Sequence, residues 1–441
     1  MLKIRTWLGL LLLTVLAVGC SGQASTKKSD SNNNGPIKLT TKSAGLNLPK
    51  GFTAVKVADS LGSTRHIAIA KNGDIYIGLR HSKNGGGIVA LRDTNNDGKA
   101  DIIKYFGKHA GTGIGLHNGY LYHSTTHAVY RYKMPDNGWI PQGSPQVVVK
   151  GFHRPRQEHA PKAFTFDNDG NIYVNVGAPS NSCQKKDRQK GSPGQNPCPL
   201  LKDYAGIWRY DASKLNQTKN GSQNRYSTGS RNVVGMAWNN QNNALYIMQH
   251  GRDQLYQNWP QYYNAKQGAE LPAEEMFKDQ KGDNFGWPYT YYDQHKNKIM
   301  LAPEYGGNGK KTVADSKWKG EFTPPVAAYP GHWAPDGLIF YTADQFPARY
   351  KNGAFIAFHG SWNRAPKPQE GYDIVFQPFK NGKAQMGKYY KFATGFAGMK
   401  KPQPGSAKHR PCGLAIGPHG SLYVTDDSGG TVWKITYTGN S

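Results

Sequence analysis

The sequence is poor in acidic side chains, with 29 Asp and Glu residues against 55 Lys and Arg residues and a formal net charge of +26. Such an excess of positive charge can serve nucleic-acid binding. No block of five or more like charges occurs, however, and the densest basic stretch, residues 185–190, is interrupted by Asp187. The sequence therefore lacks a nucleic-acid-binding arm. An anionic envelope polymer, an anionic cofactor or simple solubility explains the charge better.

Long hydrophobic runs are also missing. The apolar stretch from Trp7 to Val18 follows Lys3 and Arg5 and is too short for a comfortable membrane span. This layout is typical of a secretory signal peptide, which we predict to cover residues 1–19. Residues 16–20, LAVGC, resemble the bacterial lipobox, in which the cysteine is acylated and becomes the mature N-terminus. The alternative is an ordinary cleaved signal with a chance cysteine at position 20.

We therefore expect an exported protein that meets the membrane only through a lipid anchor at Cys20. Serine rather than aspartate follows that cysteine, which in an envelope with two membranes favours the periplasmic face of the outer membrane. Residues 20–44 are rich in Ser, Lys, Asn and Thr and poor in apolar side chains, a composition that predicts a disordered tether.

Cysteine is scarce as well, with four residues in the chain. With Cys20 lipidated, Cys183 and Cys198 lie in one insertion rich in Gly, Pro and Lys, where they can form a local disulfide in an oxidising compartment. That pairing leaves Cys412 free. Pairing Cys198 with Cys412 is equally allowed by arithmetic.

What the sequence does contain is a repeat of an apolar strand, a polar turn and a second strand. It occurs at residues 66–79, 112–125, 163–177, 235–251, 337–361 and 413–427, and a further short strand follows each copy. The turn glycines Gly73, Gly119 and Gly170 are 46 and 51 residues apart. That spacing is close to the ~40–50 residues of a propeller blade.

Six such units predict an all-β fold, a six-bladed β-propeller of four-stranded antiparallel blades that covers residues 45–441. The strand Phe52 to Val57 is available to close the ring onto the last blade. Insertions, chiefly residues 183–201 and 259–330, stretch the later blades. A β-sandwich is the alternative fold, but six self-similar units fit it poorly.

Propellers place function where the inner strands and their loops converge on the central channel. Polar residues near the predicted strand ends come from separate blades: Glu158-His159, Arg231-Asn232, residues 250–253 (HGRD), residues 359–364 (HGSWNR) and His409-Arg410. These arginines could pair with carboxylates between blades. Alternatively, converging guanidinium and amide donors suit a small planar polyanion. A histidine titrates near neutral pH, so His159 is the candidate general base.

Several of these motifs together resemble the soluble quinoprotein glucose/sorbosone dehydrogenase family. His159 followed by Asp169-Gly170, Arg231-Asn232 followed by Gly235, and residues 283–288 (DNFGWP) match motifs of that family. HGSWNR and the stretch from Arg410 to Asp427 look more like its sorbosone and pyranose dehydrogenase branch. The resemblance covers nearly everything after residue 45. It implies an exported six-bladed propeller that binds pyrroloquinoline quinone (PQQ) and calcium.

The resemblance also implies roles for particular residues. His159 would be the catalytic base and Glu158 would help to orient the site. The expected cofactor contacts are Arg231, Asn232, His250, Arg364 and Arg410, and the expected calcium ligands are the backbone carbonyls of Gly251 and Arg252. Residues 360–362 occupy the region of the family's cofactor lysine, and Cys412 stands where a second arginine is usual. These departures leave the sugar unassigned.

The resulting hypothesis is a PQQ- and calcium-dependent dehydrogenase that oxidises a hydroxyl or aldehyde group of a sugar or related polyol, aldose-like or sorbosone-like, in the cell envelope. We expect a monomer or dimer with a small sugar substrate, an unnamed electron acceptor and no nucleic acid. Residues 93–101, DTNNDGKAD, alternate as in an EF-hand but lack Glu at the twelfth position, where Lys104 stands. We interpret them as a hairpin turn with at most weak calcium binding.

Two other classes of function remain open. A propeller with bound calcium can be a lactonase-type hydrolase whose metal activates water. Alternatively, the protein is a non-catalytic binder of envelope glycans with aromatic stacking surfaces, for which the candidates are Trp287, Tyr289, Tyr291 and Tyr292. A lactonase is expected to spread acidic metal ligands over several blades, whereas this chain concentrates Arg, His and Asn there.

Overall fold

The structure is a computed structural model, and it describes residues 35–152 and 158–439. The predicted signal peptide and Cys20 lie outside the described residues. The described residues all belong to one compact unit. Among the described residues, no helix combines the length and the apolar character needed to cross a membrane.

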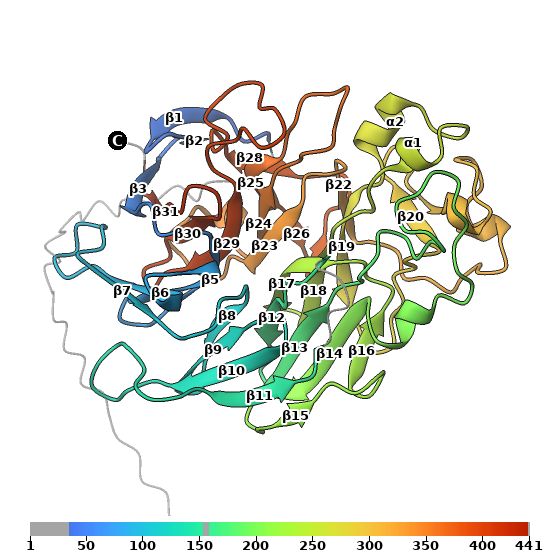
Figure 1. Cartoon of the computed structure of the whole chain (residues 1–441). Coiled ribbons are helices and arrows are strands. Elements are labelled where there is room, and N and C mark those ends of the chain that lie inside the picture. Colours follow the sequence, from blue (N-terminus) through green and yellow to red (C-terminus); the bar gives the residue numbers. More distant parts are fainter. Residues whose placement is uncertain (1–34, 153–157, 440–441) are drawn as a thin grey trace, which may run out of the picture. The chain divides into compact units, whose positions relative to one another are not determined.

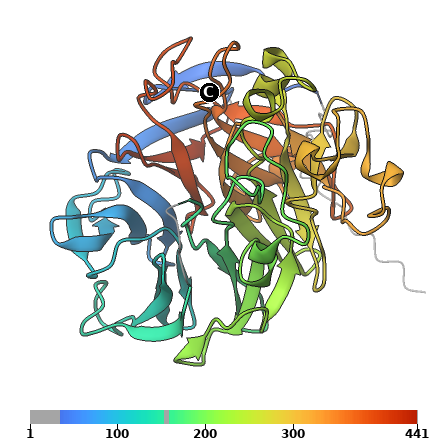
Figure 2. The same cartoon turned by 45° about the vertical axis from the view of Figure 1, so that its right-hand side comes forward.

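The compact unit is a six-bladed β-propeller, as predicted, and its blades follow one another in chain order from blue to red (Figures 1 and 2). The first blade is β4 (Thr64–Ile69), β5 (Ile75–Lys83), β6 (Gly86–Arg92) and β7 (Ile102–Phe106). The second is β8 (Ile114–His117), β9 (Tyr120–Ser124), β10 (Ala128–Lys133) and β11 (Gln146–Lys150). The third is β12 (Phe164–Phe166), β13 (Asn171–Val176), β14 (Gly206–Asp211) and β16 (Arg225–Thr228).

The later blades have the same order and antiparallel pairing. The fourth is β17 (Val233–Asn239), β18 (Ala244–Gln249), β19 (Glu274–Asp279) and β22 (Ala327–Tyr329). The fifth is β23 (Pro335–Phe340), β24 (Ala354–His359), β25 (Tyr372–Gln377) and β28 (Tyr390–Ala393). The sixth is β29 (Pro411–Ile416), β30 (Leu422–Asp426), β31 (Val432–Tyr437) and β3 (Phe52–Ala58). A two-residue strand, β15 (Gln217–Thr218), adds to the second blade in parallel with β11.

The innermost strands β4, β8, β12, β17, β23 and β29 lie next to one another around the ring. The ring closes as predicted, because β3 from the start of the described chain pairs with β31 in the register Phe52↔Tyr437 to Ala58↔Val432. Closure removes the exposed edges that two ends of an open sheet would present. It also gathers into one place the loops that connect the strands of different blades.

The strands form because apolar and β-branched side chains alternate between turns that need a left-handed backbone. Gly73 and Gly170 have φ values of +93° and +83° in the turns of the first and third blades, a conformation that favours glycine. The core then fills the space between blades. In the closing blade the Phe52 ring packs edge-on against Phe346 and Phe392, with centroid distances of 4.8 and 5.0 Å. Such aromatic pairs stabilise the fold beyond the area they bury.

Short elements decorate the blades. A hairpin of β1 (Leu39–Ser43) and β2 (Leu46–Pro49) precedes the closing strand, so the prediction of a disordered tether up to residue 44 is wrong for residues 39–43. Ser43 joins the hairpin to β3, because its hydroxyl donates to the Ala54 carbonyl and accepts from the Ala54 amide, both at 2.9 Å. Residues 93–101 form the loop of the β6–β7 hairpin, as predicted. The hairpin β26 (Phe379–Lys380) and β27 (Lys383–Ala384) extends the fifth blade.

The long insertion of the fourth blade carries most of the helical structure. It contains α2 (Ala265–Glu270) and the hairpin β20 (Thr290–Asp293) and β21 (Lys298–Leu301), and α1 (Leu255–Asn258) precedes it. The aromatic side chains considered as glycan platforms lie in this region. All four are buried: Trp287, Tyr289, Tyr291 and Tyr292. They pack the insertion and offer no surface for stacking.

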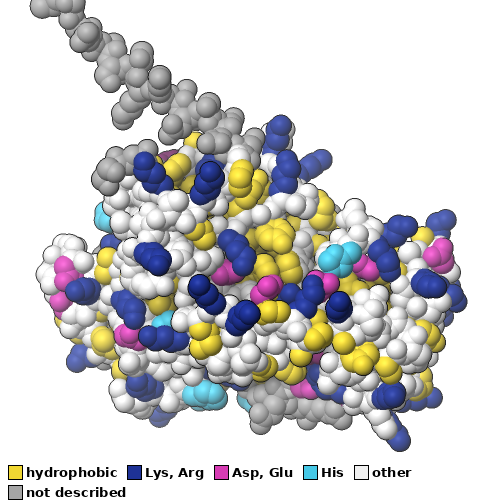
Figure 3. Space-filling model, turned by 90° about the horizontal axis from the view of Figure 1, so that it is seen from above, with side chains coloured by type: hydrophobic (Ala, Val, Ile, Leu, Met, Phe, Trp, Pro, Cys, Tyr) yellow, Lys and Arg dark blue, Asp and Glu magenta, His cyan; other side chains and the backbone are white. Residues whose placement is uncertain are grey.

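Positive side chains are spread over the surface. On the face shown in Figure 3, Lys and Arg side chains are scattered among polar and acidic groups and do not gather in one patch.

Candidate functional site

Two adjoining cavities lie where the inner strands of the blades begin. The first has a volume of about 490 Å³ and the second about 310 Å³. His159, Asn232 and His250 line both cavities and therefore form the wall that they share. The structure thus brings together His159, which precedes the third blade, and Asn232 and His250, which flank β17 and β18 of the fourth blade.

His159 lies in a turn that leads into β12 and has a positive φ of +50°. Its Nδ1 lies 2.5 Å from the carbonyl oxygen of Ala178. A carbonyl only accepts, so Nδ1 carries the proton and Nε2 is the basic nitrogen of the neutral ring. Burial lowers the pKa of His159 well below its usual range, and the nearby positive charges of Arg231 and His250 lower it further. The imidazole is therefore neutral near pH 7, the form that accepts a proton.

Glu158, the neighbour of His159, is paired with an arginine that sequence reasoning did not select. Nε of Arg188 donates to Oε1 of Glu158 at 3.0 Å. Arg188 also approaches Oδ2 of Asp253 through Nη2 at 3.2 Å. The other carboxylate oxygen of Glu158, Oε2, is buried without a hydrogen-bond partner among the described residues. Glu158 can therefore accept one further hydrogen bond from a ligand.

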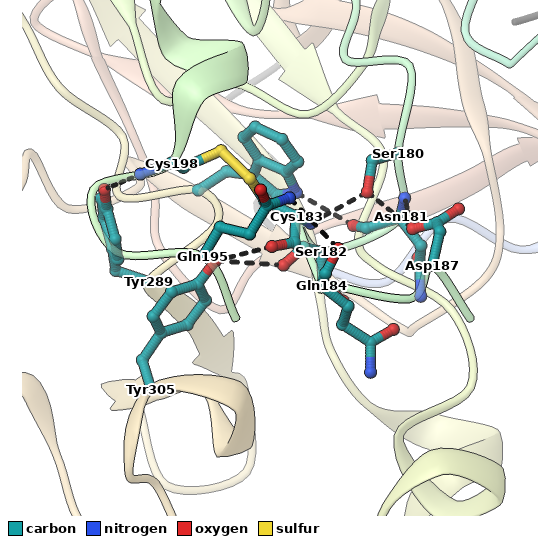
Figure 4. Close-up of a disulfide and its surroundings, with 11 residues drawn as sticks. Ser180, Asn181, Ser182, Cys183, Gln184, Asp187, Gln195, Cys198, Tyr289 and Tyr305 are labelled. Carbon is teal, nitrogen blue, oxygen red and sulfur yellow. Dashed lines mark hydrogen bonds between the residues drawn. A yellow bond between two sulfur atoms is a disulfide. The ribbon is translucent and has the colours of Figure 1, made fainter. Parts of the chain in front are cut away.

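Arg188 belongs to a loop that is closed by a disulfide between Cys183 and Cys198. This disulfide confirms the predicted pairing. Cys412 is free and buried. Figure 4 shows how the loop is fastened around the disulfide. The Cys183 amide donates to the Ser180 hydroxyl at 2.9 Å, and the Cys198 amide donates to the Tyr289 hydroxyl at 3.0 Å. The basic stretch at residues 185–190 was visible in the sequence, but its contact with Glu158 depends on this loop geometry.

Arg231 is engaged by the protein itself. Its Nη2 lies 2.9 Å from Oδ2 of Asp253, its Nη1 donates to the Gly251 carbonyl at 2.9 Å, and its Nε donates to the Asn181 carbonyl at 3.1 Å. The residue is 3% exposed. Of the two interpretations open from the sequence, the pairing of arginine with a carboxylate describes Arg231 in this structure.

Asn232 follows Arg231, but its side-chain oxygen lacks the hydrogen bonds that hold the Arg231 guanidinium. Its Oδ1 is buried and has no hydrogen-bond partner among the described residues. Burial of an unpaired polar atom is unfavourable unless a ligand or water satisfies it. Since Asn232 lines both cavities, its amide is a candidate contact for a bound molecule.

His250 belongs to a series of linked ion pairs between charged side chains of different blades. Its Nε2 lies 3.2 Å from Oδ1 of Asp336, and Nη1 of Arg65 lies 3.1 Å from Oδ2 of the same carboxylate. Arg65 also reaches Asp427 at 2.7 Å. Burial opposes the charged imidazolium, but the hydrogen bond and charge of Asp336 prevail and raise the pKa of His250 above its usual value. Sequence reasoning missed Arg65 and Asp336, although both stand at the starts of repeat units.

Two predicted cofactor residues lie outside the two cavities. Arg364 donates to the Gly331 carbonyl at 2.9 Å and pairs with Glu370 at 3.2 Å, beside a separate cavity of about 570 Å³. Arg410 donates to the carbonyls of His359 and Gly360 at 3.0 and 2.6 Å. In this structure both guanidinium groups donate to backbone carbonyls, and their contact with a cofactor stays a prediction. In the HGSWNR segment, the residues that line the second cavity are Trp362 and Asn363.

Gly251, whose backbone carbonyl is an expected calcium ligand, lines the second cavity. The Gly251 carbonyl accepts the hydrogen bond from Arg231, and the Arg252 side chain turns away to pair with the buried carboxylate of Glu304. Calcium takes six to eight oxygen ligands. Among the residues that the structure describes, no group of three or more His, Cys, Asp and Glu side chains is placed to hold a metal ion.

The first cavity suits an anionic ligand better than a cation. Arg65, Arg80 and Lys162 line it, against one carboxylate, Asp336. Arg80 is exposed at its entrance, whereas Lys162 is buried and donates to the Ala160 carbonyl at 2.8 Å. A planar polyanion needs several compensating donors when it is buried. The positive lining meets that need, whereas the unpartnered Oδ1 of Asn232 is an acceptor for an N–H or O–H group of the ligand.

Comparison with known proteins points to one group of propellers. A profile of the TrAA12-like family matches residues 46–438 of the chain. An uncharacterized protein of Borreliella burgdorferi is 31% identical over 209 residues, or 47% of this chain. The match spans 48% of that relative, so the chain aligns with about half of its length.

Solved structures share the fold at low sequence identity. The iodide and calcium structures of the Trichoderma reesei Carbohydrate-Active Enzymes Family AA12 protein are 18% and 17% identical, with TM-scores of 0.71 and 0.70. Each covers 92% of this chain, and the match takes in 100% and 99% of the fungal chains. The holo form of the pyranose dehydrogenase PQQ domain from Coprinopsis cinerea is 18% identical, with a TM-score of 0.68, over 91% of this chain and 98% of that domain.

Proposed function

Because the chain belongs to the TrAA12-like family, we propose that it is an oxidoreductase that oxidises a hydroxyl or aldehyde group of a sugar or related polyol with PQQ as its cofactor. The geometry that supports this proposal is the hydrogen bond from Nδ1 of His159 to the Ala178 carbonyl at 2.5 Å. It fixes the tautomer with Nε2 as the basic nitrogen, in the wall between two cavities.

In the proposed reaction His159 removes the proton from the substrate O–H at Nε2. Its lowered pKa keeps the ring neutral and ready to accept that proton. Glu158 orients the site through Arg188, and its free Oε2 accepts a hydrogen bond from a substrate hydroxyl. When bound, the quinone supplies the two-electron acceptor for the hydride that leaves the substrate carbon.

Asn232 and His250 would hold the quinone, with Arg80 and Lys162 providing positive charge at the first cavity. Arg364 and Arg410, the other two expected contacts, do not line these two cavities. Calcium, which the resemblance to quinoprotein dehydrogenases implies, enters the proposal as an additive to be tested, with the backbone carbonyls of Gly251 and Arg252 as its expected ligands. We place the reaction in the cell envelope, at a protein anchored through Cys20, with an external electron acceptor.

A titration of the purified protein with PQQ, with and without calcium, tests the proposal. We expect a saturable change in the quinone absorbance, followed by reduction of an artificial dye when aldoses or polyols are added. A protein that binds quinone but opens lactones and reduces no dye across a broad panel of sugars would be a hydrolase. A protein that leaves the quinone spectrum unchanged at saturating concentrations would contradict the cofactor assignment.

A further inference from the structure

A large aromatic side chain is exposed at the second cavity. Trp362 is 54% exposed and lines this cavity together with Glu158 and His159. Its neighbours Ser361 and Arg364 are buried. Exposure of an indole forgoes the gain that burial of its apolar surface would provide. A ligand that covers the indole would bury this exposed apolar surface.

The backbone around Trp362 is held on both sides. The Ser361 hydroxyl donates to Oε1 of Gln369 at 2.9 Å, and the Tyr372 hydroxyl donates to the Ser361 carbonyl at 2.5 Å. On the other side, the side-chain amide of Asn363 donates to Oδ1 of Asp253 at 2.8 Å. The indole thus projects from a fixed segment, and a ligand that contacts it has little backbone to order.

The charges of the second cavity compensate one another. Among the described residues that line it, the guanidinium groups of Arg188 and Arg231 face the carboxylates of Glu158 and Asp253 within ion-pair distance. Glu274 adds a third carboxyl group, and burial raises its pKa above the usual value. An anionic ligand would meet carboxylates here, in contrast to the first cavity. The unpartnered Oε2 of Glu158 is an acceptor for a hydroxyl group.

From these observations we infer that Trp362 is the stacking platform for a neutral pyranose ring in the second cavity. The ring covers the indole with its C–H face, whose partial positive charge suits the negative face of the aromatic ring. Its hydroxyl groups reach Glu158 and His159. The inference rests on the proposed function in identifying this ring as the substrate, and it narrows the substrate class from sugars and polyols to cyclic, uncharged sugars.

Binding can be measured apart from turnover. Methyl β-D-glucopyranoside is a suitable probe, because its anomeric carbon is blocked, and it is titrated calorimetrically into the intact protein without quinone. We expect Trp362→Ala to weaken binding about tenfold, the loss typical of a truncated aromatic anchor. Trp362→Phe should retain part of the affinity. Tyr262→Ala, which removes another exposed aromatic residue that does not line either cavity, is the matched control and should bind as the parent does.

Two further probes test the ligand class. Sorbitol, which has the hydroxyl groups but no ring, and glucuronate, which has the ring and a negative charge, should both bind more weakly than the glucoside. Equal affinity of the glucoside for the parent and for Trp362→Ala would overturn the platform, as would equal affinity of the parent for sorbitol.

The two proposals fail in different ways. If the glucoside binds through Trp362 but aldoses with quinone reduce no dye, the proposed oxidation is wrong and the carbohydrate site stands. If aldoses reduce dye with the same KM in the parent and in Trp362→Ala, the platform is wrong and the oxidation stands.

Discussion

Arg231 and Asp253 form an ion pair of 2.9 Å inside the propeller, and Arg188 approaches the same carboxylate oxygen at 3.2 Å. Burial by itself would raise the pKa of Asp253. The positive charge of Arg231 outweighs it, with contributions from His332 and Arg188, and holds that pKa well below its usual range. The carboxylate is therefore charged near neutral pH, and it pairs with both arginines, of which Arg188 has a second partner in Glu158.

Asp253→Asn should destabilise the protein strongly, because it leaves the buried Arg231 without its counter-charge. The expected decrease in the free energy of unfolding is about 3–5 kcal/mol, measured by urea denaturation. Asp344→Asn is the control, since Asp344 pairs with Lys351 at the surface and is largely exposed. Its effect should be small. Similar unfolding midpoints for both variants would contradict a structural role of the Arg231–Asp253 pair.

The sequence predicted the six blades of the propeller through the repeated strand–turn–strand unit. Apolar alternation and turn glycines are local signals, and the strand at Phe52 had no other partner than the last blade. The Cys183–Cys198 disulfide was accessible in the same way, because both cysteines lie in one insertion. Residues 39–43 were misjudged because their polar composition concealed a strand that pairs with the apolar β2.

The side-chain directions in the site could not be predicted from sequence. Arg364 follows Asn363 directly, yet Asn363 bonds Asp253 in the second cavity whereas Arg364 pairs with Glu370 outside it. Arg188 meets Glu158 across thirty positions of sequence. Such contacts depend on how a loop folds, and neither periodicity nor spacing encodes them.

Phe52→Ala tests the closure of the ring. The Phe52 ring is buried against Phe346, Tyr350 and Phe392 in the last interface between blades. Its removal leaves a cavity that the surrounding rings fill only in part, so the free energy of unfolding should fall by about 3–5 kcal/mol. Thermal denaturation followed by circular dichroism measures the change. A loss below about 1 kcal/mol would mean that the closing strand contributes little to stability.

Glu275→Gln should change how stability depends on pH. Burial raises the pKa of Glu275 from 4.5 to about 8, and the neighbouring Glu274 adds to the shift. Between these two values the folded state holds a proton that the unfolded state has lost, so stability decreases as the pH rises through this window. Glutamine does not titrate and should flatten the decrease.

Urea midpoints at pH 5, 6.5 and 8 provide the measurement for Glu275→Gln. The variant should gain stability relative to the parent as the pH rises. Glu321→Gln, which changes an exposed residue, should follow the parent at every pH. An unchanged slope in Glu275→Gln would show that another group governs this pH range.

Replacement of both Cys183 and Cys198 by serine should destabilise the protein by about 3 kcal/mol, the loop-closure value for a separation of 15 residues. The loop also carries Arg188, so loosening it should weaken the Arg188–Glu158 contact and lower turnover. The matched control is Cys412→Ser, which changes a free cysteine. If the double variant keeps both the parent melting temperature and the parent turnover, the disulfide does not position Arg188.

His159→Gln tests the chemistry of the site. Glutamine retains hydrogen bonding but cannot take a proton at neutral pH, so turnover in the dye assay should fall ~10²–10⁴-fold while quinone affinity is kept. His127→Gln, a change at an exposed histidine outside both cavities, should leave turnover unchanged.

The pH dependence of kcat/KM in the parent protein tests the same assignment of His159. Burial, Arg231 and His250 lower the pKa of His159, so kcat/KM should hold as the pH falls from 7.5 to 6 and decline only when the base is protonated at lower pH. Turnover in His159→Gln equal to that of the parent, or an acid limb above pH 6.5, would exclude His159 as the base.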